Sequence, residues 1–179
     1  MPRLFVAIDL PEESKELVKP LRATLPEARW VSPDQLHLTL RFIGDTDEAQ
    51  CAAIQSLLAG VTVPPLELAL QNIGWFPAHG NPHVLWVGLS ESPQLSSLHQ
   101  DIEIALISAG ILPDERSFSP HITIARLKDM QRSHLQKFVA ATPPFRSPLF
   151  TITEFRLYAS TLTPTGAIHN CLQTYPLQA

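Results

Sequence analysis

Hydrophobic and polar positions along the chain predict short strands and helices in an irregular order. From Leu36 to Phe42 every second residue is hydrophobic, which is the period of a strand with one buried face. Helical spacing follows Ser92-Pro93, where serine is a favoured N-cap and proline fits the first helical position. The predicted strands cover residues 4–8, 36–42, 66–73, 83–87, 121–124, 151–158 and 169–175, and the predicted helices cover residues 17–25, 49–58, 93–109 and 132–141.

The order of these elements predicts a mixed α+β fold with antiparallel sheets. A doubly wound parallel sheet fits less well, because the regular alternation of strand and helix is absent. Neither of the glycine-rich phosphate-binding motifs, GxGxxG and GxxxxGK[ST], occurs. Pro20 lies inside the first helical pattern and removes a backbone donor, so we expect a kink or an early end there.

Length and charge limit the kinds of partner that the chain can bind. Its 179 residues, of which 45% are hydrophobic, suffice for one domain with its own core. The net charge of −4 argues against a broad basic surface that contacts many phosphates. We therefore expect a ligand with few phosphates, such as an RNA 3′ end or a small nucleotide, bound by a monomer.

Cysteine content and the N-terminal pattern bear on location and on metal binding. The two cysteines, Cys51 and Cys171, form no CxxC pair and are too few for a disulfide framework, which favours a reducing cytoplasm. The apolar run near the N-terminus contains Asp9 and is too short for a signal segment or a membrane span. His79 and His83 lack partners at ligand spacing, so no metal and no cofactor are expected. His99, His134 and His169 are expected at the surface.

Two similar tetrads contain the candidate chemistry. His37-Leu38-Thr39-Leu40 and His121-Ile122-Thr123-Ile124 each follow a Ser-Pro pair, which indicates an internal duplication. On a strand, residues two apart share a face, so each tetrad presents an imidazole beside a hydroxyl. Such a pair of strands suits cleavage of a phosphodiester without metal.

Each residue type has a role in that chemistry. A neutral imidazole can take a proton from water while a protonated one gives a proton to the leaving oxygen, and both forms exist near neutral pH. His37 and His121 are therefore the candidate catalytic residues. Thr39 and Thr123 could donate hydrogen bonds to phosphate oxygens. Arg41 and Arg126 are further candidates for substrate binding, through a charged contact.

Strict alternation makes the two arginines differ. It places Arg41 on the face of His37, whereas Arg126 falls opposite His121 and needs a bulge or the strand end to reach the site. Phe42 falls on the core face by the same rule. The two arginines are therefore expected only to assist.

Several segments resemble those of one enzyme family. They are 3–11 (RLFVAIDLP), 36–44 (LHLTLRFIG) and 120–126 (PHITIAR). These are similar to the bacterial and archaeal RNA 2′,3′-cyclic phosphodiesterases, also called 2′-5′ RNA ligases, of the two-histidine phosphoesterase superfamily. Residues 155–160 (FRLYAS) resemble the last part of that family, so the likeness spans nearly the whole chain.

The resemblance implies a fold and a reaction. The fold is bilobal and pseudo-twofold, with two antiparallel sheets around a central cleft, outer helices, and residues 1–179 forming one domain of two interwoven lobes with one HxTx motif on each. The reaction opens a 2′,3′-cyclic phosphate to a 2′-phosphate without metal. By motif position, His37 corresponds to the acid and His121 to the base. Reverse 2′-5′ ligation is also implied, and the sequence does not decide the direction.

Two alternatives remain open at this point. The same chemistry could act on a 2′-5′ oligonucleotide or a small cyclic nucleotide. A nucleotide- or RNA-binding module without catalysis is the other alternative, although both histidines and both threonines of the tetrads are intact.

Overall fold

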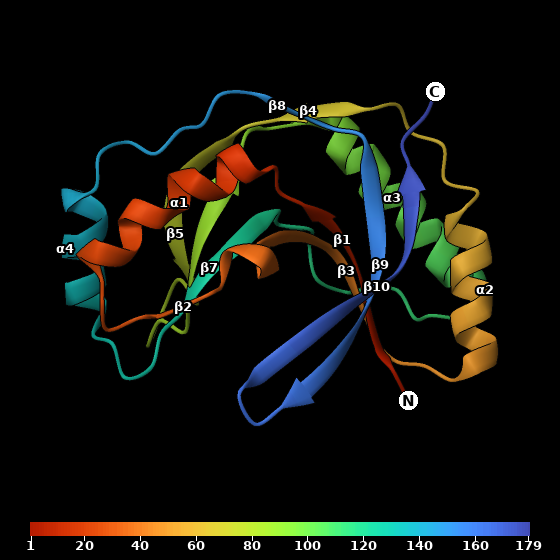
Figure 1. Cartoon of the computed structure of the whole chain (residues 1–179), viewed down its shortest axis with the longest axis horizontal. Coiled ribbons are helices and arrows are strands. Elements are labelled where there is room, and N and C mark those ends of the chain that lie inside the picture. The colour runs from red at the N-terminus through yellow and green to blue at the C-terminus, as the bar shows by residue number, and fades with distance from the viewer.

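Antiparallel strands form the centre of the molecule, and helices lie on its outer sides (Figure 1). The computed structural model describes residues 1–179. In the first sheet the strands follow the order β10 (Gly166–Pro176), β9 (Glu154–Thr163), β1 (Arg3–Asp9) and β3 (His37–Asp45). In the second they follow the order β2 (Arg29–Trp30), β7 (His121–Arg126), β6 (Val84–Leu89) and β5 (Leu70–Phe76). A two-stranded sheet joins β4 (Leu66–Leu68) to β8 (Phe150–Ile152). The predicted α+β class is confirmed.

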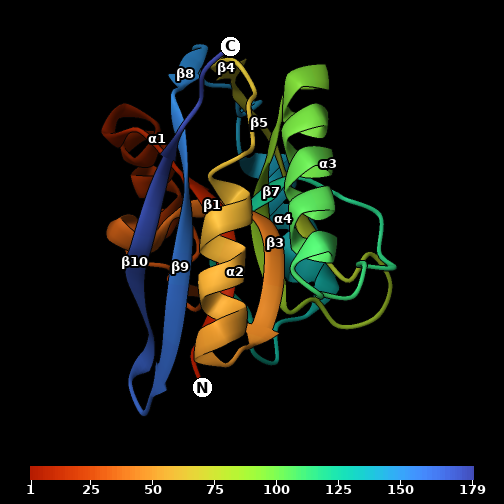
Figure 2. The same ribbon diagram turned by 90° about the vertical axis from the view of Figure 1, so that its right-hand side faces the viewer.

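Four helices cover the two sheets. They are α1 (Glu12–Thr24), α2 (Glu48–Leu58), α3 (Pro93–Ser108) and α4 (Arg132–Ala141), and a 3-10 helix, η1, spans Pro33–Gln35. Helices α1 and α4 lie on one side of the molecule, and α2 and α3 lie together on the other (Figures 1 and 2). No helix combines the length and the hydrophobicity that a membrane crossing requires.

The structure confirms some predicted helix boundaries and corrects others. Ser92 accepts a hydrogen bond from the backbone N–H of Leu95, as expected of an N-cap with proline next to it. Helix α1, in contrast, continues past Pro20 to Thr24, so an early end was wrong. Pro20 is exposed, and water can therefore hydrogen-bond the carbonyl that proline leaves without a partner.

Two predicted strands are each divided in two. The run 151–158 becomes β8 and the first part of β9, which belong to different sheets. The run 66–73 becomes β4 and β5, which belong to different sheets. The break falls at Ala69, whose N–H is bound by the Ser90 hydroxyl instead of a neighbouring strand. Hydrophobicity alone could not show this break, because Leu68, Ala69 and Leu70 are all buried.

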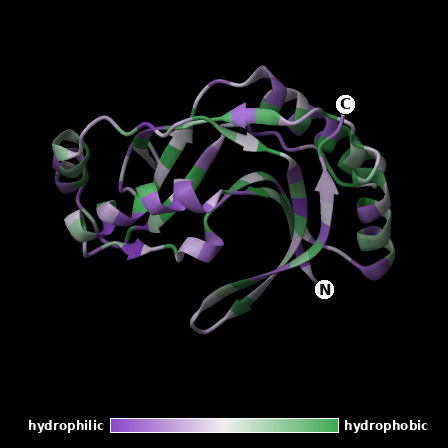
Figure 3. Cartoon of the chain, turned by 45° about the horizontal axis from the view of Figure 1, so that its top comes forward, coloured by the Kyte–Doolittle hydropathy of each residue, from purple (hydrophilic) through white to green (hydrophobic).

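The chain crosses between the sheets several times, so neither sheet comes from one continuous segment. Strand β1 belongs to the first sheet, β2 to the second, β3 to the first, and β5 to β7 to the second again. Hydrophobic positions are concentrated on the strands (Figure 3). One cluster of 35 buried residues includes Leu38 from the first sheet and Ile122 from the second. The description as one domain of two interwoven lobes stays a prediction.

The two HxTx strands sit in the same register against their neighbours. In the first sheet the pairs run from Phe5 opposite Phe42 to Asp9 opposite His37. In the second they run from Val84 opposite Arg126 to Gly88 opposite His121. Each ladder has a register shift directly after the threonine of its motif. Strands β3 and β7 also contact each other, which brings the two motif strands together between the sheets.

Candidate active site

Both motif histidines are held by the same backbone contact. His37 Nδ1 lies 2.7 Å from the carbonyl oxygen of Gln35, and His121 Nδ1 lies 2.8 Å from that of Ser119. A carbonyl oxygen can only accept, so Nδ1 carries the proton in each ring. The other nitrogen, Nε2, therefore remains free to take or give a proton. This is the arrangement that an acid/base pair needs.

Aromatic rings surround His37. The Phe5 ring centroid lies 5.2 Å from that of His37, and Tyr158 stacks on the other side of Phe5 at 5.3 Å. Burial lowers the pKa of His37 below its usual 6.5; the Gln35 carbonyl opposes this, and nearby His169 lowers the pKa further. At a given pH, His37 is therefore protonated less in the free protein than an ordinary imidazole is, and the negative charge of a bound phosphate would raise its pKa again.

His121 has a different setting. The Phe76 ring meets its imidazole edge-on at 4.9 Å, and Trp86 lies 6.5 Å away. The Trp86 indole lies directly over Gly74, where a Cβ atom would overlap the ring. Trp86 is also opposite Thr123 in the ladder. The missing side chain at Gly74 thus leaves room for the large Trp86 ring beside the second motif.

A β-bulge in each motif strand changes which side chains face the site. Leu40 and Ile124 are the residues left unpaired directly after the motif threonines. After the bulge, Phe42 is opposite Phe5 and contacts its ring, with centroids 5.9 Å apart. Phe42 is 60% exposed, so its expected place in the core was wrong. The extra residue reverses the alternation that the sequence suggested.

The same bulge has opposite effects on the two arginines. Directly opposed residues of an antiparallel pair share a face, so Arg126 lies on the face of Thr123 and His121. The sequence pattern predicted that Arg126 would need such a bulge, or the strand end, to reach the site. Arg41, however, is turned away from the His37 face and is only 8% exposed, so its expected position was wrong.

The Arg41 guanidinium is occupied by other groups. Its Nε donates to Glu103 Oε2 at 2.8 Å, and its Nη2 donates to the Leu112 carbonyl at 2.6 Å. Nη1 donates to the Phe42 carbonyl. Most of its donors are therefore already bound by protein groups, and the geometry gives no support to a phosphate contact by Arg41.

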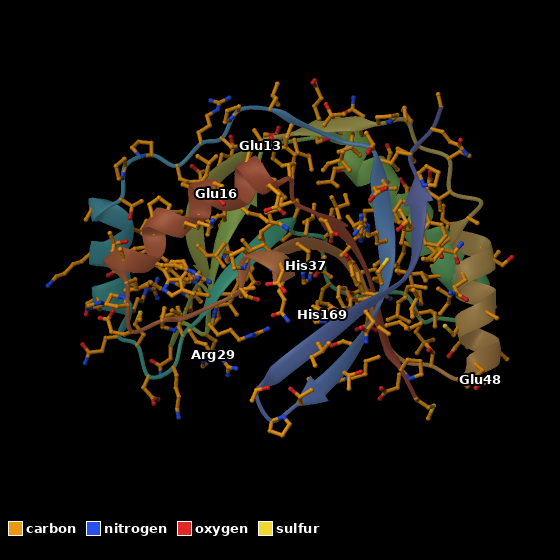
Figure 4. The ribbon with its side chains drawn as sticks, viewed as in Figure 1. Glu13, Glu16, Arg29, His37, Glu48 and His169 are labelled. Carbon is orange, nitrogen blue, oxygen red and sulfur yellow. The ribbon has the colours of Figure 1, made fainter.

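A third histidine, His169, lies beside the first motif. Its ring is 5.6 Å from that of His37, at nearly a right angle, and Figure 4 shows both near the middle of the molecule. His169 is half-buried, and its Nδ1 is shielded from solvent without a hydrogen-bond partner. The expectation of a surface position was therefore wrong. No sequence signal links the two histidines, because only the successive pairing of β3, β1, β9 and β10 brings them together.

A cavity of about 230 Å³ opens beside His37. It is lined by Phe5, Asp9, Asp34, Gln35, His37, Tyr158, Ile168 and His169. Within it the Tyr158 hydroxyl donates to Asp9 at 2.7 Å, and Arg156 Nη1 donates to the same carboxylate at 2.7 Å. Burial, followed by this hydrogen bond, raises the pKa of Tyr158 to about 12. Tyr158 therefore remains a hydroxyl donor at neutral pH.

These features define a class of protein, an α+β fold with two HxTx strands in matched registers and one oriented histidine at the start of each strand. Residues 10–163 match the sequence model of the 2′-5′ RNA ligase superfamily. The chain belongs to this family, as its sequence motifs indicated.

Named relatives agree with this placement. The chain is 32% identical to the RNA 2′,3′-cyclic phosphodiesterase of Archaeoglobus fulgidus, over 97% of this chain and 99% of that one. It is 36% identical to that of Escherichia coli K12, over 88% of this chain and 86% of that one. Compared with the crystal structure of E. coli LigT in complex with 3′-AMP, the chain has a TM-score of 0.80 and 28% sequence identity, over 99% of each chain. The expected two-histidine fold is thereby confirmed.

Proposed function

We propose that this protein hydrolyses 2′,3′-cyclic phosphates at RNA ends or on nucleotides to 2′-phosphates, with His37 and His121 as its acid and base. The observation that carries the proposal is the matched pair of imidazoles. Each has Nδ1 bound to the carbonyl two residues earlier, which leaves Nε2 for the substrate. The relatives named RNA 2′,3′-cyclic phosphodiesterase support the reaction class.

The proposed step balances without an added reactant. His121 Nε2 takes a proton from water as its oxygen attacks the phosphorus. The bond from phosphorus to the 3′ oxygen breaks, and protonated His37 gives that oxygen its proton. The product carries a 2′-phosphate and a free 3′ hydroxyl, and proton exchange with solvent restores both imidazoles. The same step with a 5′ hydroxyl in place of water would make a 2′-5′ linkage and release the 3′ hydroxyl from a 2′,3′-cyclic phosphate.

Other residues of the motifs would stabilise the charge that grows on phosphate. The Thr39 and Thr123 side chains share the faces of His37 and His121, and their hydroxyls would donate to the non-bridging oxygens. Arg126 is exposed on the same face and would add a cation. No such role is proposed for Arg41, whose donors are bound elsewhere.

The proposed substrate is a short nucleotide or RNA end bound by a monomer. The net charge of −4 disfavours long phosphate tracks. The similar LigT structures with 3′-AMP and with phosphate are consistent with a small phosphate-bearing ligand. The exposed Phe42 ring would offer the base a hydrophobic contact.

We further propose that the chain forms one domain of two lobes. We also propose a cytoplasmic location, because its two cysteines are too few for a disulfide framework.

The first test measures hydrolysis of a 2′,3′-cyclic nucleotide in excess chelator. We expect full activity of the native protein and a loss of about 10²- to 10⁴-fold in His37→Ala and in His121→Ala, because each removes a proton-transfer group. His79→Ala is the matched control, since His79 is exposed in the loop between β5 and β6 and belongs to neither motif. Turnover near the native rate in either motif variant would refute the two-histidine mechanism, and loss of activity with chelator would indicate a metal enzyme.

A further inference from the structure

The segment that leads into the second motif is tied to the strand of the first. This segment, residues 109–120, connects α3 to β7 and contains Ser119, whose carbonyl binds His121 Nδ1. At its start, the Leu112 carbonyl accepts from Arg41 Nη2 at 2.6 Å. Arg41 belongs to β3, so the strand that begins with His37 holds the segment that orients His121.

Glu103 on α3 completes this attachment. Its Oε2 accepts from Arg41 Nε at 2.8 Å, and its Oε1 accepts from the backbone N–H of Asp114 at 3.1 Å. One carboxylate thus links α3, β3 and the segment. The Arg41 and Glu103 side chains are 9% and 19% exposed. Burial opposes ionisation of Glu103, but the contacts with Arg41 and Asp114 outweigh it and lower its pKa.

A second contact holds the end of the same segment. The Phe118 ring stacks on His99 of α3, with centroids 4.0 Å apart and planes within 5°. His99 and Glu103 lie one helical turn apart on α3. Ser119 directly follows Phe118. The segment is therefore fixed to β3 and α3 at residues 112–114 and to α3 again at Phe118, directly before the residue that contacts His121.

We propose that Arg41 and Glu103 form a positioning pair that sets the orientation of His121 from the strand of His37. Neither residue touches the substrate. The pair holds residues 112–114, and through them the Ser119 carbonyl keeps the proton of His121 on Nδ1 and Nε2 toward the phosphate. The inference rests on the proposed function for its catalytic consequence, but the orientation of the ring can be measured without substrate.

The test uses Glu103→Gln, Arg41→Lys and the double variant. We expect kcat to fall about tenfold or more in each single variant, because small misplacements of a catalytic group are costly, while KM stays within about twofold. The double variant should lose little more than either single one, since both residues act through one network. Glu12→Gln is the control, because Glu12 makes an exposed ion pair on α1.

A separate readout follows the His121 ring. In ¹⁵N spectra of the substrate-free protein, Glu103→Gln should weaken the signal of the Nδ1-protonated form of His121 and leave that of His37 unchanged. Thermal unfolding above the assay temperature establishes that each variant is folded. If Arg41→Lys does not fold, Glu103→Gln alone decides, since it retains the arginine.

Two results would overturn the inference. If Arg41 binds phosphate instead, Arg41→Lys raises KM whereas Glu103→Gln keeps native kcat. Unchanged kcat together with an unchanged His121 spectrum in Glu103→Gln also contradicts a positioning role. Absence of cyclic-phosphate hydrolysis in the native protein would instead refute the proposed function, and the spectra would still test the pair.

Discussion

At the scale of single residues, the two motif histidines share one backbone contact but not one environment. His37 contacts Phe5 and His169, whereas His121 contacts Phe76 and lies near Trp86. Burial and the neighbouring imidazole both lower the pKa of His37. The duplicated motif thus supplies two similar imidazoles that lie in different surroundings.

His169 provides a test of this difference. In His169→Asn the pKa of His37 should rise, because two nearby imidazoles repel each other when both are protonated. The other charged or titratable groups around His37 are Asp9, Asp34, Arg156 and Tyr158, and the variant leaves them in place. NMR titration of His37 would show a midpoint at higher pH, and His79→Asn should not move it. A midpoint that stays or falls would contradict the electrostatic account.

The residues of the candidate site were predictable to different degrees. His37, His121 and the two threonines could be chosen from the sequence, because a repeated tetrad with alternating hydrophobicity shows both the strand and its polar face. His169 and Tyr158 could not, since their nearness to the first motif depends on long-range strand pairing.

At the scale of elements, the bulges decide which residues share the face of the motif histidines. Leu40 and Ile124 interrupt the ladders, so Phe42 and Arg126 take the exposed positions and Arg41 is buried. Strict alternation failed here because a bulge depends on the register of the partner strand as well as on local hydrophobicity. The strands and helices themselves were largely predictable. Helix α4, for example, begins and ends where its hydrophobic pattern predicts.

The contact between β5 and β6 gives an element-scale prediction. Gly74→Ala should displace the Trp86 ring, because the new methyl group would occupy its space. We expect a loss of about 1–3 kcal/mol in the free energy of unfolding. We also expect a lower kcat/KM, because the Trp86 ring near His121 would shift. Denaturant unfolding and the cyclic-nucleotide assay measure both effects.

Gly60→Ala is the control for this change. A Cβ atom there would lie 3.4 Å from its nearest neighbour, the Leu57 carbonyl oxygen, which is an ordinary contact. Equal stability losses in the two variants would argue against the packing of Trp86 on Gly74. Native stability in Gly74→Ala would also argue against this packing.

At the scale of the whole molecule, the chain crosses repeatedly between the sheets, so the candidate site takes one motif strand from each sheet. His37 starts a strand of the first sheet and His121 a strand of the second, and these strands contact each other. The β9–β10 hairpin adds a further connection, because Arg29 of β2 donates to the Thr165 carbonyl and Gln35 of η1 donates to that of Ala167 (Figure 1). Resemblance to a family indicated this arrangement, whereas hydrophobic patterns alone gave only the class of fold.

The most direct test of the central claim is the pH dependence of kcat/KM for a 2′,3′-cyclic nucleotide in the native protein, His37→Asn and His121→Asn. The native profile should be bell-shaped, because one imidazole must be protonated and the other neutral. His37→Asn should lose the decrease at high pH, and His121→Asn should lose the decrease at low pH. Two variants that both keep the full bell would contradict an acid and a base supplied by these two histidines.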